Sequence, residues 1–300
     1  MKRILNLGAG IGSTTVYLLA ADGLIDPFDV AIFADTQGEP KAVYNHLRWM
    51  QGLADSGKGP PIIVASRGSL AADLLAGVNA AGPGRKGGGR FASIPAFTGD
   101  PISLQSEGRT GRQCTGDYKV DVVEKVIRQQ LFGLKARQRM PAGKQVVQLF
   151  GLHDDEAGRI KRVGNRFRAH PWAEAEFPLA KLGWPRAKCV EYLSRRVPHQ
   201  VPRSACLFCP YRSDREWKHL RDTEPESFQE AVRIDHAIRD PSAACTAGLR
   251  KSLYLHRSLT PLAMVDIDSG AAREEERARR GKRQLDLFEL EDCGVGMCGI

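Results

Sequence analysis

The chain has 300 residues, is 42% hydrophobic and 26% charged, and carries 44 Lys and Arg residues against 35 Asp and Glu residues. This composition is ordinary for a globular protein. No apolar run approaches the roughly 20 residues that span a bilayer, and no apolar stretch of roughly 7–15 residues precedes a secretory cleavage site. Neither a membrane-spanning nor a secreted protein is therefore expected, and a cytoplasmic location is expected instead.

Three strand–helix pairs are predicted in the first 77 residues. The strands are expected at 3–7, 29–33 and 61–65, and the helices at 13–21, 41–53 and 70–75, from short apolar runs and helical apolar stripes. Strands that alternate with helices indicate a parallel sheet with crossover helices. The expected fold class is therefore α/β, a twisted and mostly parallel sheet with flanking helices.

The remainder of the chain is less regular. Residues 77–97 are rich in Gly and Arg and are predicted to form a mobile surface loop, which either closes over an anionic ligand or is an inert insertion. Helices are expected at 117–131, 185–195 and 225–239, and a fourth strand at 144–151. The charged residues 271–283 are expected to form a solvated helix or a disordered linker.

A glycine-rich turn follows the first strand. Its residues Gly8 to Gly12 have the spacing G-x-G-x-G before Ser13, which differs from the G-x-G-x-x-G of a Rossmann fingerprint and from a P-loop. Backbone N–H groups at a helix N-terminus can hold a phosphate, although a plain strand-to-helix turn remains the alternative. Asp35 ends the second strand and could orient a ribose or a metal, whereas Glu39 could simply cap the next helix.

The seven cysteines indicate metal binding or thiol chemistry rather than disulfides, because no export signal is found. Cys206 and Cys209 form a Cys-x-x-Cys-Pro pair that can chelate one metal or one cluster edge; two buried apolar cysteines are the alternative. Cys293 and Cys298 lie in a glycine-rich tail. Each could be a metal ligand, a nucleophile or a surface thiol. Cys189 and Cys245 are expected to be packing residues.

Several segments match one family in order along the chain. Four segments carry the resemblance. They are Phe33-Ala34-Asp35-Thr36 with Glu39-Pro40, Arg112-Gln113-Cys114-Thr115 with Lys119, residues 151–161 with Asp155, Glu156 and Arg159, and residues 204–217 with the Cys-x-x-Cys-Pro pair. Together they resemble the phosphoadenosine phosphosulfate (PAPS) reductase family of the adenine nucleotide alpha-hydrolase superfamily, over nearly the whole chain. The PP-loop of this superfamily, S-G-G-x-D-S, would fall on residues 8–13, where its first Ser and its Asp are absent.

The resemblance implies an adenine-nucleotide site and a metal centre. Its nucleotide, ATP or another adenine nucleotide with or without Mg²⁺, would contact Gly8, Ala9, Gly10, Ile11, Gly12, Ser13, Ala34, Asp35, Thr36, Gly151, Arg112, Lys119 and Arg159. It also implies that Cys114 meets Cys206 and Cys209 in space. A 4Fe–4S iron–sulfur cluster, or zinc as the alternative, would then take Cys114, Cys206 and Cys209 as ligands, with Cys298 or Cys293 as the fourth.

Three functions fit these expectations. The first is adenine-nucleotide-dependent sulfur transfer, in which a nucleic-acid substrate would contact the basic runs 159–168 and 273–283. The second is a sulfonucleotide reductase with Cys293 as its nucleophile. The third is a non-catalytic nucleotide- and metal-binding subunit of a DNA-modification or phage complex.

The candidate catalytic residues are Cys293 and Asp155. His153, beside Asp154 and Asp155 in the strand-end segment, is either an acid or base or only a hydrogen-bonded residue. Three regions are expected: a nucleotide-binding α/β domain at 1–183, a helical region with the Cys-x-x-Cys pair at 184–268, and a charged linker with a cysteine-containing tail at 269–300. The oligomeric state is left open.

Overall fold

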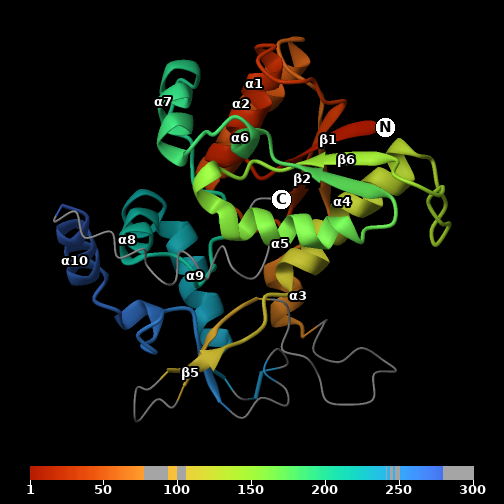
Figure 1. Cartoon of the computed structure of the whole chain (residues 1–300). Coiled ribbons are helices and arrows are strands. Elements are labelled where there is room, and N and C mark those ends of the chain that lie inside the picture. Colours follow the sequence, from red (N-terminus) through yellow and green to blue (C-terminus); the bar gives the residue numbers. More distant parts are fainter. Residues whose placement is uncertain (78–93, 100–105, 241, 244–245, 247–250, 280–300) are drawn as a thin grey trace.

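The computed structural model describes residues 1–77, 94–99, 106–240, 242–243, 246 and 251–279, and all structural statements concern these residues. A five-stranded parallel sheet forms the centre of the molecule (Figure 1) in the order β3–β2–β1–β6–β7. Its strands are β1 (Lys2–Leu7), β2 (Val30–Asp35), β3 (Ile62–Ser66), β6 (Val146–Leu149) and β7 (Ala173–Glu176). The predicted α/β class is thus confirmed.

The strand order reverses direction between β1 and β6. The chain runs outward from β1 to β2 and β3, and later continues from β6 to β7 on the other side of β1. In open α/β sheets, ligands bind beyond the carboxyl ends of the strands at such a reversal point. The turns that follow β1 and β6 are therefore the first place to look for a site.

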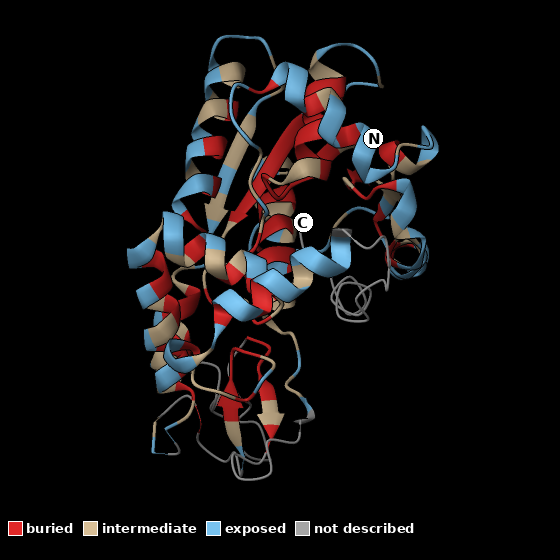
Figure 2. Ribbon diagram, turned by 90° about the vertical axis from the view of Figure 1, so that its left-hand side faces the viewer, coloured by how far each residue is buried: buried red, intermediate tan, exposed pale blue. Residues whose placement is uncertain are grey.

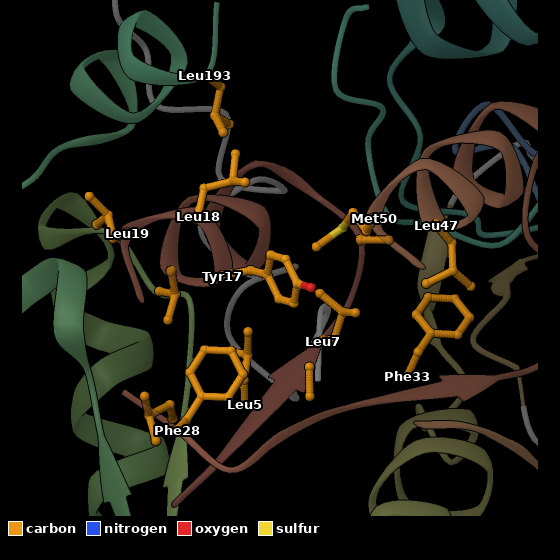
Figure 3. Packing of buried hydrophobic residues seen from close by; sticks show 14 of the residues in the cluster. Leu5, Leu7, Tyr17, Leu18, Leu19, Phe28, Phe33, Leu47, Met50 and Leu193 are labelled. Carbon is orange, nitrogen blue, oxygen red and sulfur yellow. The ribbon is translucent and has the colours of Figure 1, made fainter. Parts of the chain in front are cut away.

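Helices cover both faces of this sheet. Successive side chains along each strand point to opposite faces, and both faces are apolar. Leu5, Leu7 and Phe33 pack with α1 (Ile11–Ala21), α2 (Lys41–Asp55) and α7 (Arg186–Arg196) (Figure 3). Ile4 and Ile32 face the opposite way, toward α4 (Asp121–Val126) and α5 (Ala157–Arg168). Figure 2 shows the buried strands between helices whose outer surfaces are exposed. Among the described residues, no helix is long and apolar enough to cross a bilayer.

Most helices expected from the sequence are present, with small shifts at their ends. The helix expected at 117–131 consists of α4 between two π-helical turns, η1 (Gly116–Val120) and η2 (Ile127–Leu131). The charged segment near 271–283 begins as helix α10 (Ile267–Arg279). The helix α7, expected within the helical region 184–268, packs through Cys189 and Leu193 into the core on the α1 side of the sheet.

A second core lies beyond the carboxyl ends of the strands. It gathers α3 (Leu70–Leu75), α8 (Asp214–Thr223) and α9 (Pro225–Ala237) around the buried Trp217. A small antiparallel sheet adjoins it, in the order β5 (Ser106–Arg109), β4 (Phe97–Gly99) and β8 (Ser252–Tyr254). Residues 94–97 are buried, so the expectation of a surface loop over 77–97 is wrong at this end, while 78–93 lie outside the described residues.

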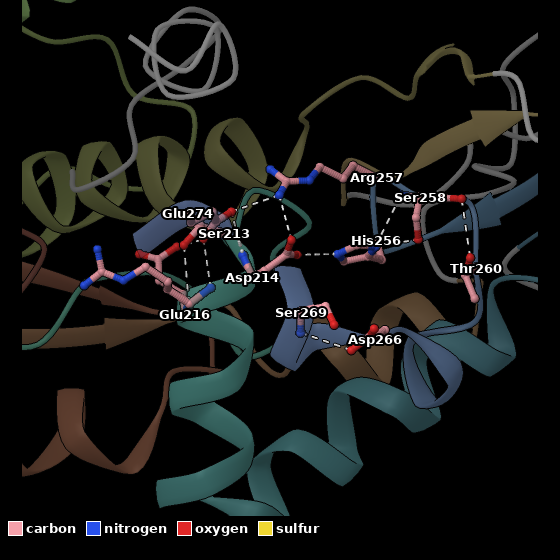
Figure 4. A network of polar contacts seen from close by, with 11 residues as sticks. Ser213, Asp214, Glu216, His256, Arg257, Ser258, Thr260, Asp266, Ser269 and Glu274 are labelled. Atoms are coloured by element: carbon pink, nitrogen blue, oxygen red, sulfur yellow. Dashed lines mark hydrogen bonds and ion pairs between the residues drawn. The ribbon is translucent and has the colours of Figure 1, made fainter. Parts of the chain in front are cut away.

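A polar network ties α8 to α10 and to the segment after β8 (Figure 4). The buried carboxylate of Asp214 accepts from His256 Nε2 at 2.7 Å and from Arg257 Nη2 at 2.8 Å. Glu274 of α10 accepts the backbone N–H of Asp214 and of Arg215. A Cβ on Gly270 would lie 2.2 Å from Asp214 Oδ2, so α10 can approach α8 this closely only with glycine. These contacts hold the C-terminal helices on the second core.

A buried histidine links the first two helices to the chain beyond α7. His46 Nε2 and Thr14 Oγ1 lie 2.9 Å apart, and His46 Nδ1 lies 2.9 Å from Nε2 of the exposed His199. Burial, and then the neighbouring His199, lower the pKa of His46 to about 4. His46 is therefore neutral in the folded chain at neutral pH.

This shift predicts acid sensitivity of the fold. The unfolded chain binds a proton at His46 near its ordinary pKa of 6.5, whereas the folded chain resists protonation down to about 4, so stability is present above pH 6.5 and is lost as pH falls through about 4. The loss attributable to this group is about 3 kcal/mol. Urea denaturation at pH 7 and at pH 4 measures how far the free energy of unfolding decreases between them. This decrease should be about 3 kcal/mol smaller in His46→Gln than in the unsubstituted chain. Equal losses in the two chains would contradict the assignment.

Candidate functional site

The glycine turn, residues 8–13, connects β1 to α1 at the reversal point. Ala9 has a left-handed backbone (φ +54°) although it is not glycine, and such strain is concentrated at functional sites. The hydroxyl of Ser13 accepts from the N–H of Gly8 and donates to the carbonyl of Gly10, at 3.2 and 3.3 Å. The N-terminus of α1 has no side-chain cap and no acidic residue in its first turn, so its partial positive charge is not offset there.

Gly12 in this turn touches the backbone of Gly151, which follows β6. A Cβ on Gly12 would lie 1.9 Å from the carbonyl oxygen of Gly151, and a Cβ on Gly151 would lie 2.3 Å from the backbone N of Ser13. Both positions therefore need glycine for this close approach. The sequence-based placement of Gly151 beside the turn agrees with this geometry.

A segment from the far end of the chain lies against the other side of the turn. A Cβ on Gly10 would come within 3.2 Å of Ser204 Cβ and 3.9 Å of the carbonyl oxygen of Pro202. This covering segment, residues 202–204, leads directly into the Cys-x-x-Cys pair. Gly10 and Ile11 nevertheless keep partial solvent exposure, so the turn remains accessible at that point.

Three cysteines line one cavity beside this segment. The thiol cavity is bounded by Cys114, Cys206 and Cys209, and by the polar residues Thr36, Arg112, Thr115, Lys119 and Ser204. Thr36 comes directly after β2, so the cavity lies at the same edge of the sheet as the glycine turn. Ser204 belongs to both places, because it lines the cavity and contacts Gly10.

A tight turn holds the Cys-x-x-Cys pair. The N–H of Cys209 donates to the carbonyl of Cys206 at 3.1 Å, and the N–H of Leu207 donates to the carbonyl of Gly38 at 2.7 Å. The buried guanidinium of Arg212 donates to the carbonyls of Ala205 and Cys206, at 2.8 and 3.1 Å. The pair is therefore fixed to the loop after β2 by backbone contacts.

Cys206 has a polar but enclosed environment. Its Sγ lies 3.3 Å from Thr36 Oγ1 and 3.5 Å from Glu39 Oε1, and Lys119 Nζ lies 3.5 Å from the same Glu39 oxygen. Burial raises the pKa of the Cys206 thiol well above its ordinary range, and the charge of Glu39 raises it further. The thiol is thus protonated at neutral pH when nothing replaces its proton.

The donor chemistry of the thiol cavity suits a soft metal, but its present spacing does not form a ligand set. In the part of the chain that the structure describes, no three Cys, His, Asp or Glu side chains are grouped closely enough to hold a metal ion. A fourth thiol could come from the tail, but Cys293 and Cys298, like Cys245, lie outside the described residues. Cys189 is fully buried in the core, as expected for a packing residue.

The predicted nucleotide-binding residues fall into two groups. Gly151 adjoins the glycine turn. Arg159 is linked to the turn indirectly, because it pairs with Glu156 at 2.8 Å and Glu156 bonds His153, which lies next to the turn. Thr36, Arg112 and Lys119 instead line the thiol cavity.

The remaining predicted residues have structural contacts. Ala34 is buried against α4. The Asp35 carboxylate accepts from the Gln37 N–H and from the hydroxyl of Tyr44, both at 2.8 Å. Asp155, expected to be catalytic, is exposed and accepts from the N–H of Arg186 at the start of α7.

Comparison with known protein-family models, with curated proteins and with solved structures finds no match.

The contact at Gly12 predicts a sharp difference between two glycine substitutions. Gly12→Ala places a methyl group on the Gly151 carbonyl, which cannot move without shifting β6, so we expect a loss of about 3 kcal/mol or more of unfolding free energy. Gly52→Ala is the matched control: it lies in α2 with no atom within 4 Å of its Cβ position, and it should stabilise by about 0.5–1 kcal/mol. Urea denaturation of both variants measures the difference, and similar stabilities would contradict the geometry.

Proposed function

We propose that this chain is an adenine-nucleotide-dependent enzyme of sulfur chemistry. The observation that carries the proposal is the thiol cavity, in which Cys114 and the distant pair Cys206 and Cys209 lie beside a glycine turn at the reversal point of a parallel sheet. A nucleotide phosphate would occupy the glycine turn, and sulfur would be handled in the thiol cavity. The family resemblance of the sequence motifs supports the same combination.

The nucleotide half of the proposal rests on the N-terminus of α1. Backbone N–H groups of the first helical turn lack partners within the helix, and they point at any anion bound there. The absence of a capping side chain and of acidic residues in the first turn of α1 leaves this charge for a ligand. Adenine is the base that the resemblance implies, with or without Mg²⁺ on the phosphates.

The thiol half favours an anionic metal–sulfur group over a free nucleophile. A raised pKa makes Cys206 a poor thiolate at neutral pH, whereas metal binding replaces the thiol proton. Arg112 and Lys119 in the cavity wall offer positive charge to such a group. When bound, a 4Fe–4S cluster would supply redox or sulfur-carrying chemistry, with Cys114, Cys206 and Cys209 as ligands and Cys298 as the candidate fourth; zinc would be a structural alternative.

A nucleic-acid acceptor fits the surface next to the site. The helix α5 starts beside His153 and carries five basic residues and no acidic one. Lys161, Arg166 and Arg168 are exposed on it. Basic residues in a row along a helix suit the phosphates of a nucleic acid, so sulfur transfer to nucleic acid is preferred over the release of sulfite.

Protein purified without oxygen tests this proposal. We expect visible charge-transfer absorption with about four irons and four sulfides per chain, lost in Cys206→Ser and in Cys209→Ser. Cys189→Ala is the control, because this thiol lies in the core away from the cavity, and it should keep its iron. A colourless protein with about one zinc per chain, or undiminished iron in Cys206→Ser, would contradict the proposal.

A further inference from the structure

His153 carries a buried ring nitrogen that the proposed chemistry does not yet use. The residue follows β6 and is only 6% exposed. Its Nε2 has no hydrogen-bond partner within the described residues. This nitrogen lies 3.4 Å from the Cβ position of Gly12, so it faces the first turn of α1. A buried polar atom without a partner is costly, and ligand binding is one way to satisfy it.

The other ring nitrogen is held by a carboxylate. His153 Nδ1 lies 2.8 Å from Glu156 Oε2, and the backbone N–H of His153 donates to the same oxygen at 2.8 Å. Arg159 Nη1 donates to Glu156 Oε1 at 2.8 Å. Burial alone would raise the pKa of Glu156, but the bonds from His153 and the charge of Arg159 lower it to about 2. Glu156 is therefore ionised at neutral pH and fixes a proton on Nδ1.

This arrangement leaves Nε2 with two states. In the neutral ring, Nε2 presents a lone pair to the glycine turn, which an anion avoids. In the protonated ring, Nε2–H becomes a donor beside the first turn of α1. The charges of Glu156 and Arg159 offset each other, so the protonated ring adds one positive charge that a bound anion would match.

The neighbouring titratable groups do not supply this charge. From α7, the Cys189 thiol is neutral, because burial raises its pKa to about 11. Asp155 is exposed and bonded to the backbone of Arg186. Glu156, just before α5, pairs with the ring, and Arg159 of α5 pairs with Glu156, both at 2.8 Å.

We infer that His153 is a proton-linked binding residue for a phosphate or pyrophosphate group at the glycine turn. The inference rests on the proposed function, since it assigns the anion to the nucleotide site. Binding proceeds with uptake of one proton by Nε2, and the new N–H donates to a phosphate oxygen while the α1 N–H groups hold the others. Affinity therefore falls as pH rises, and it falls further than the ionisation of the anion alone requires.

Calorimetry with inorganic pyrophosphate tests the inference on the full-length chain. Titrations at pH 7.5 in buffers of different ionisation enthalpy give the number of protons taken up on binding. The unsubstituted chain should take up close to one proton more than His153→Gln, and it should bind about tenfold more tightly at pH 6.5. His219→Gln, at an exposed site on α8, is the matched control and should behave as the unsubstituted chain does.

The outcomes separate the inference from the proposed function. Equal proton uptake and equal affinity in His153→Gln would overturn the inference while leaving the nucleotide site in place. Failure of the unsubstituted chain to bind pyrophosphate and ATP would overturn both. If His153→Gln does not fold, ¹⁵N NMR of the imidazole in the unsubstituted chain decides: pyrophosphate should convert the Nε2 signal of His153 to its protonated form, and an unchanged signal would overturn the inference.

Discussion

The contact between Gly12 and Gly151 is the constraint on which the site depends. It brings together the chain ends of β1 and β6, the two strands between which the sheet reverses its order. A side chain at either position would separate these strand ends and move the first turn of α1. The same contact places His153, two residues after Gly151, against that turn. The proposed phosphate site and its proposed proton link thus depend on one backbone contact.

The two halves of the site are joined through residues 202–209. This stretch covers Gly10 at one end and supplies Cys206 and Cys209 at the other. His199, just before it, is tied to α2 through His46, and Leu207 is tied to the loop after β2. A ligand that displaces Ser204 from Gly10 must therefore also disturb the wall of the thiol cavity. Such a connection would let nucleotide occupancy control access to the cysteines.

Regular local patterns made four strands of the central sheet predictable, whereas the edge strand β7 and features that depend on distant contacts were not predicted. The alternating strand and helix signals of the first 77 residues correspond to β1–α3, because each element has its own periodicity. The small sheet pairs three- and four-residue strands from positions near 98, 107 and 253, and no local pattern of that length distinguishes a strand from a loop.

The candidate site was predictable in part for the same reason. The glycine turn and the Cys-x-x-Cys pair are local motifs that can be recognised in the sequence. In the structure the two motifs lie next to each other, because Ser204 contacts Gly10 and lines the thiol cavity. Arg112 and Lys119, expected to contact the nucleotide, line the thiol cavity, and this place depends on contacts between distant segments that the sequence does not show. Asp155, the expected catalytic residue, is exposed, whereas Glu156 is half-buried and contacts the buried His153 and Arg159; burial cannot be read from this short acidic run.

The central claim is that the glycine turn and the thiol cavity act as one site. The most direct test is the rate of iodoacetamide alkylation of Cys206 and Cys209, followed by mass spectrometry, in metal-free protein with and without ATP. Because Ser204 contacts both places, saturating ATP should change both rates at least about threefold while leaving the core thiol Cys189 unreactive. Unchanged rates at an ATP concentration that calorimetry shows to be saturating would contradict a single joined site.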